Sequence, residues 1–96
     1  MSTLELRRDD IVIESGTFYL VLAIGPRTFD LIEECGGTTR YRHDVGRRVR
    51  VVTFDDFQRD SAYHSRVVAA LRREAAEARD ERKRGARRRR GHVTRY

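Results

Sequence analysis

Residues 11–24 read IVIESGTFYLVLAI, and this stretch decides how the chain begins to fold. β-Branched and aromatic residues dominate it, which is typical of strands. Ser15-Gly16 interrupts the run with a pair that suits a tight turn, because glycine tolerates positive φ. The stretch therefore predicts a β-hairpin. Its second strand, residues 17–24, is apolar on both alternations, which indicates a central strand covered on both faces.

Three more short strands are expected after this hairpin. Gly25-Pro26 breaks the pattern, residues 27–34 resume it, and Gly36-Gly37 supplies the next turn. Residues 39–43 and 48–52 then alternate strictly, as half-buried strands do. The chain thus predicts an α+β fold with a mostly β core, a small five-stranded antiparallel meander. We expect it to curl into an SH3-like barrel or a bent sheet, since either limits exposed edges; the resemblance to SH3-like modules is one of layout only.

A long helix is predicted from about residue 54 to residue 84. This segment lacks glycine and proline, and strong helix formers dominate its second half. Thr53 or Asp55 can cap its N-terminus. Mostly apolar side chains recur on one helical face: Phe54, Phe57, His64, Val67, Val68, Leu71, Ala75 and Ala78. We expect the N-terminal half to anchor the helix to the sheet.

The second half of this helix has little to bury, because its apolar stripe thins to alanine after Leu71. It is expected either to project from the body or to pack against a partner. Leu71, Ala75 and Ala78 are therefore candidate partner-binding residues, and a homodimer through the helix is one form of such packing. Gly85 is the expected end of the helix, and residues 85–96 are expected to order only on binding.

The positive charge of the chain is concentrated at its C-terminal end. The net charge is +6, yet residues 1–53 balance eight arginines against eight acids, and residues 54–81 carry five arginines and seven acids. The remaining eight cations lie in residues 82–96, which contain no acid. Such a segment on a balanced body indicates a polyanionic partner, most often nucleic acid. The candidate phosphate contacts are Arg84, Arg87, Arg88, Arg89 and Arg90; the alternatives are a merely solvated tail or an acidic protein surface.

A second group of arginines lies on the last two predicted strands. If their turn centres on Val45, Arg42 faces Arg48 and Arg40 faces Arg50. Like charges directly opposite one another destabilise a sheet. Either an anion binds this face, which would add these four arginines to the nucleic-acid interface, or acids of the preceding strand neutralise them. Those acids are Asp30, Glu33 and Glu34, and both interpretations stay open.

Neither a catalytic site nor a metal or cofactor site is expected. Cys35 and the three histidines (His43, His64 and His92) lack the paired spacing of metal ligands. The adjacent acids Asp55-Asp56 and Glu33-Glu34 diverge on a helix or strand, so neither pair forms a catalytic dyad. The glycines match no P-loop or dinucleotide fingerprint. Most of the aromatic residues fall at core spacing and are expected to pack in the core. If one of them stacks on a base, Tyr19 is the best candidate, because it lies off the face of Phe18 and Leu20.

These observations divide the chain into an N-terminal extension (1–9), a β unit (10–53), a helix (54–84) and an Arg-rich tail (85–96). The leading hypothesis is a small non-catalytic nucleic-acid-binding protein, for DNA or RNA. The alternative is a protein-interaction module that docks through its helix and barrel edge, such as a small bacterial or phage regulator, inhibitor or assembly component. With one cysteine, no signal peptide and no apolar run of about 20 residues, we expect a soluble cytoplasmic protein without membrane contact.

Overall fold

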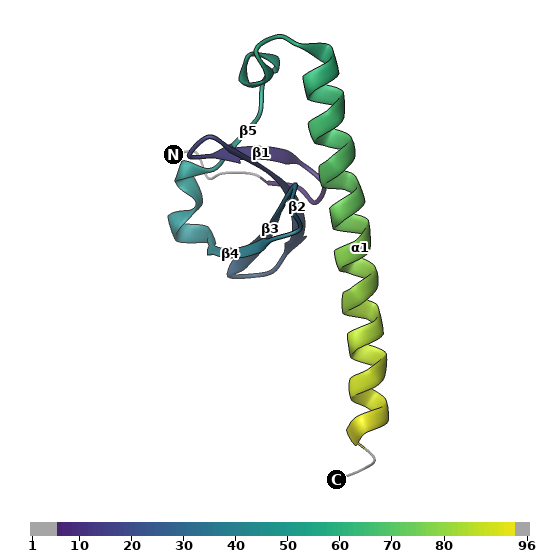
Figure 1. The fold of residues 1–96 in the computed structure, drawn as a ribbon. Helices are drawn as coiled ribbons and strands as arrows, with labels where there is room; N and C mark the ends of the chain where they lie inside the picture. Colours follow the sequence, from purple (N-terminus) through teal and green to yellow (C-terminus); the bar gives the residue numbers. More distant parts are fainter. Residues whose placement is uncertain (1–5, 94–96) are drawn as a thin grey trace.

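A computed structural model of the protein describes residues 6–93, except for the side chains of residues 45–47 and 86–93. Five strands form one antiparallel sheet, and a single long helix, α1 (Ser61–Val93), runs beside it (Figure 1). The predicted α+β class is confirmed, and the sheet is bent and not closed into a barrel. Its strands lie in the order β4-β3-β2-β1-β5; they are β1 (Ile11–Glu14), β2 (Thr17–Ile24), β3 (Thr28–Glu33), β4 (Thr38–Arg42) and β5 (Arg50–Val51).

The first four strands form the predicted meander. In the β1–β2 hairpin Glu14 pairs with Thr17, so Ser15 and Gly16 make a two-residue turn. Their φ angles are 52° and 79°, the combination that matches the right-handed twist of the two strands. The turn predicted from Ser15-Gly16 is therefore confirmed, and it fixes the register of β1 against β2.

The fifth strand departs from the prediction. Residues after β4 form a 3-10 helix, η1 (His43–Arg48), which carries the chain to the opposite edge of the sheet. There β5 pairs with β1, with Arg50 opposite Ile13 and Val51 opposite Val12. The predicted β4–β5 hairpin is not formed. This route buries Val49, which is only 1% exposed, inside the bend of the sheet, and burial of a valine side chain stabilises the fold by about 1.5–3 kcal/mol.

The sheet bends around its own inner face. In a flat sheet β4 and β1 would lie about 14 Å apart, yet the Tyr41 hydroxyl on β4 donates a hydrogen bond to Glu14 on β1 at 2.9 Å. Burial, together with this bond to a carboxylate, raises the pKa of Tyr41 to about 12. Tyr19 is 8% exposed within the same face, so it is a core residue and no base-stacking platform. The core of the inner face comprises Val12, Tyr19, Val21, Phe29, Leu31 and Val49.

Helix α1 covers the outer face of the sheet, so β2 is covered on both faces, as predicted. The core between helix and sheet comprises Phe18, Leu20, Leu22, Ile32, Phe57, Val67, Leu71 and Ala75. Leu71 is 0% exposed and Ala75 is 1% exposed, while Ala78 is half-buried against the same core. The face predicted to bind a partner is thus occupied by the protein's own sheet, because the alanines allow the helix to approach it closely.

Both ends of α1 differ from the predicted helix. Phe54–Phe57 forms a separate 3-10 helix, η2, and positive φ angles at Gln58 (57°) and Arg59 (54°) separate it from α1. The Asp60 carboxylate then accepts hydrogen bonds from the backbone N–H groups of Ala62 and Tyr63, which caps α1. At the other end the helical backbone passes through Gly85 to Val93. A single glycine costs a helix only about 1 kcal/mol, and strong helix formers surround this one.

Candidate functional site

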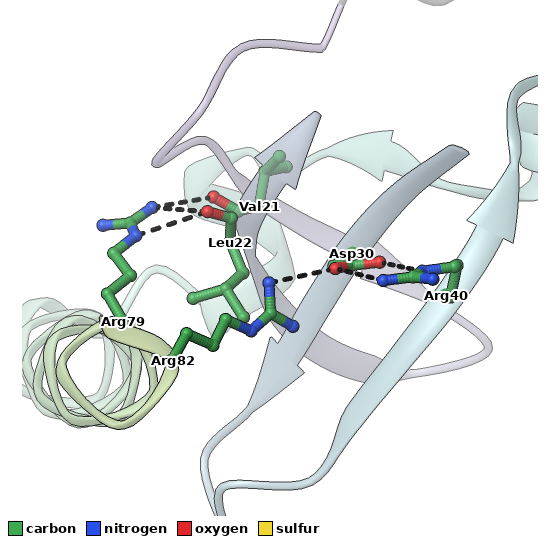
Figure 2. Close-up of polar contacts among 6 residues, drawn as sticks. All are labelled: Val21, Leu22, Asp30, Arg40, Arg79 and Arg82. Carbon is green, nitrogen blue, oxygen red and sulfur yellow. Dashed lines mark hydrogen bonds and ion pairs between the residues drawn. The ribbon is translucent and has the colours of Figure 1, made fainter. Parts of the chain in front are cut away.

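Arg79 ties α1 to an irregular point of the sheet. The β2–β3 register shifts between Val21 and Ala23, so β2 bulges at Leu22. Arg79 Nη2 and Nε donate to the Leu22 carbonyl at 2.9 and 3.3 Å (Figure 2). Its Nη1 donates to the Asp9 carboxylate at 2.8 Å. One guanidinium therefore joins the helix, the bulge and the segment that precedes β1.

A buried carboxylate holds the next arginine of this helix face. Asp30 on β3 is 6% exposed and accepts hydrogen bonds from Arg40 of β4 at 2.8 and 3.3 Å. From the other side Arg82 of α1 reaches Asp30 at 3.1 Å (Figure 2). The hydrogen bond from Arg40, with the nearby charge of Arg82, lowers the pKa of Asp30. Two positive charges thus share one negative charge, which leaves this junction net positive.

A basic pocket lies where α1 passes the end of β2. A cavity of about 350 Å³, which we call the basic pocket, is lined by four cations: Arg8, Arg79, Arg82 and Lys83. The other lining residues are apolar: Leu22, Ala23 and Ile24, of which Ile24 is 42% exposed. Arg8 and Lys83 are both exposed, and among the described residues neither forms an ion pair.

The four arginines predicted to share a hairpin face do not come together. Arg40 pairs with Asp30, Arg42 with Asp44 at 2.6 Å, and Arg50 with Asp56 through a 2.8 Å hydrogen bond. Arg50 and the Thr53 backbone N–H lower the pKa of Asp56 strongly. Arg48 lies in η1 and is exposed. Neutralisation within the protein therefore accounts for Arg40, Arg42 and Arg50, although for two of them the acids differ from those considered in the sequence.

Residues 85–93 of the predicted tail are part of α1 and not a separate segment, and residues 94–96 lie outside the described residues. Arg84 pairs with Asp80 one helical turn earlier, and the helical backbone includes Arg87, Arg88, Arg89 and Arg90, whose side chains lie outside the description. The yellow C-terminal end of α1 continues beyond the strands (Figure 1). Among the described residues, Ala78 is the last residue of α1 that packs against the core.

A second cavity, of about 240 Å³, shares Arg82 with the basic pocket and is also lined by Asp30, Thr38, Thr39 and Arg40. Among the side chains that the structure describes, no three His, Cys, Asp or Glu residues gather as metal ligands, and the His92 side chain lies outside that description. His43 Nε2 lies 2.9 Å from the Gly25 carbonyl, and the His64 ring packs edge-on against Phe57 at 4.7 Å. No helix of the described part combines the length and apolar character needed to cross a bilayer. No protein-family model matches the sequence, and no curated protein and no solved structure matches it either.

None of the four cations of the basic pocket was predicted from the sequence as a site residue, and of these Arg79 left a signal that could have been used. Arg79 lies one helical turn after Ala75 and continues the apolar stripe of the helix. An arginine at such a position indicates that its guanidinium has a hydrogen-bond acceptor nearby. Replacing Arg79 with methionine should lower the free energy of unfolding by about 1–3 kcal/mol, because the Leu22 carbonyl loses a charged donor. Urea unfolding of this variant and of Arg72→Met, an exposed arginine of the same helix, gives the comparison. Equal losses in both would contradict a specific role for Arg79.

Proposed function

We propose that the protein is a small non-catalytic nucleic-acid-binding protein. Its contact surface comprises the basic pocket and the C-terminal end of α1 from Lys83 onward. The supporting observation is the distribution of charge: three of the four candidate arginines of the sheet region pair with carboxylates, while residues 82–96 carry eight cations and no acid of their own. Of these eight, Arg82 and Arg84 pair with Asp30 and Asp80. The single cysteine suits a reducing compartment, so we place this function in the cytoplasm.

The fold suits this role through the stiffness of α1. A 33-residue helix is about 50 Å long, and its N-terminal half is fixed to the sheet by Val67, Leu71 and Ala75. The basic end is therefore presented on a rigid support and not on a free chain, which lowers the ordering entropy lost on binding. Arginine and lysine that replace counterions around phosphates give affinity that depends on salt and not on sequence.

Fluorescence anisotropy tests this function directly. The native chain is titrated into a labelled DNA duplex of about 20 base pairs and into a single-stranded RNA of similar length, from about 50 to 300 mM salt. We expect log K to fall linearly with log salt, with a slope of about −4 to −6, as four to seven neutralised phosphates predict. No binding to either probe at about 50 mM salt, or a slope near zero, would overturn the proposal.

The alternative of a protein-interaction module has one observation in its favour. Val51 on β5 is 48% exposed and Phe54 at the start of η2 is 47% exposed, so two apolar side chains face solvent near one edge of the sheet. A protein partner at this edge, as a bacterial or phage regulator would require, predicts affinity that depends weakly on salt. Loss of that affinity in Val51→Asp would support this alternative over nucleic-acid binding.

A further inference from the structure

The basic pocket brings together cations from distant parts of the chain. Arg8 belongs to the segment before β1, whereas Arg79, Arg82 and Lys83 belong to α1. Arg79 and Arg82 are held in place, the first by the Leu22 carbonyl and the second by Asp30. The Arg79 guanidinium is largely occupied by its bonds to Val21, Leu22 and Asp9. Arg82 keeps N–H donors beyond its contact with Asp30, so the pocket offers a prepositioned guanidinium beside two exposed cations.

The acids near the pocket do not cancel its charge. Asp9 is bonded to Arg79, Asp30 is shared by Arg40 and Arg82, and Asp80 is paired with Arg84. Glu81 is the remaining acid of this stretch of α1, and it is exposed. Arg8 and Lys83 are the charges left to attract a ligand, and an anion between them would relieve their mutual repulsion.

We propose that the basic pocket holds one backbone phosphate of a bound nucleic-acid strand, an inference that rests on the proposed function. A phosphodiester is the anion that suits several converging Arg and Lys donors. A volume of about 350 Å³ lies at the lower end of ligand pockets and takes a phosphate with its sugar. Ile24 and Ala23 form an apolar wall against which the sugar packs.

In this arrangement the basic pocket and the C-terminal end of α1 contribute to binding in different ways. The pocket fixes one phosphate, because Arg79 and Arg82 are already ordered by the sheet. From there the strand continues along α1 toward residues 87–90, whose arginines add affinity without selecting a position. The pocket thus sets where the strand lies on the protein, and the helix end sets how tightly it is held.

The test uses the full chain with Arg8→Gln and Lys83→Gln combined. Both residues are exposed, so the fold should be retained, which a thermal melt verifies. Removing two cations from around the one pocket phosphate should weaken binding of the duplex about tenfold at 0.1 M salt and flatten the salt slope by about one. The matched control, Arg72→Gln with Arg73→Gln, removes the same charge from exposed positions about 15 Å along the helix from Lys83, and should change affinity less than threefold.

The outcomes separate this inference from the proposed function. If the native chain binds and the pocket variant binds with the native slope, the pocket assignment is overturned while nucleic-acid binding stands. Equal weakening by the control pair would also overturn it, since net charge alone would then explain the loss. If the native chain binds no nucleic acid, both proposals fail. A fourth measurement compares probes with and without a 5′ phosphate: equal affinity supports a backbone phosphate, and dependence on the terminal group overturns that choice.

Discussion

Replacing Leu71 with alanine is expected to lower the free energy of unfolding by about 2–5 kcal/mol. Leu71 is 0% exposed and lies in the core between α1 and the outer face of the sheet, with Leu20, Ile32 and Val67 among the members of that core. Truncation removes buried apolar surface and leaves a cavity that helix and sheet cannot both close. Because small domains are stable by only about 5–15 kcal/mol, this one change should remove much of the stability of the fold.

Urea unfolding followed by circular dichroism measures this loss, and Arg72→Ala supplies the matched control. Arg72 is the next residue along the helix and is exposed, so its replacement tests helix propensity without touching the core. We expect a change below about 0.5 kcal/mol in the control. A loss under about 1 kcal/mol for Leu71→Ala would show that α1 packs only loosely on the sheet and that its apolar stripe awaits a partner.

The parts of the fold that the sequence predicts correctly are those set by local chemistry. The β1–β2 hairpin follows from Ser15-Gly16, whose backbone conformation only a few residue types adopt at low cost. The next two turns follow from Gly25-Pro26 and from Gly36, whose φ of 91° requires a glycine-like backbone. In each case the residues that favour the turn are the residues that form it, so the prediction depends on only a few neighbouring positions.

The position of β5 could not be read in the same way. Residues 48–52 alternate as a strand does, but alternation does not tell which edge the strand joins. The choice depends on whether Val49 fills the inner core, which is a property of all five strands together. The start of α1 was obscured for a related reason. Phe54 and Phe57 have helical spacing, yet the cap that begins the helix is Asp60, and two residues with positive φ precede it.

The candidate site also combines a part that the local sequence predicts with a part that depends on the packing of distant segments. The basic segment of α1 is visible in the sequence as a run of cations, and the helical backbone extends through most of it. The basic pocket is not visible, because Arg8 and Lys83 are brought together only when β1, β2 and α1 are packed. The hairpin arginines were misplaced because their interpretation depended on the register of a strand pair that does not form.

Neutralising Arg87, Arg88, Arg89 and Arg90 together with glutamine should weaken nucleic-acid binding by about a hundredfold at 0.1 M salt and flatten the salt slope by about three to four. Glutamine keeps the helix propensity of this segment high, so the helical backbone should remain while its charge is lost. Deleting residues 85–96 should give a similar loss of affinity and leave the unfolding free energy unchanged, since the last core contact of α1 among the described residues is Ala78.

The matched control removes four charges from Arg59, just before α1, and from the N-terminal half of the helix, by changing Arg59, Arg66, Arg72 and Arg73 to glutamine. These side chains are exposed and lie more than a screening length, about 10 Å at 0.1 M salt, from the segment that is neutralised. If position matters, the control should lose less than about fivefold in affinity. Equal losses would mean that the net charge of the chain drives binding and that α1 presents no defined surface. A deletion that loses much more than the glutamine variant would assign part of the contact to the helix backbone and its remaining side chains.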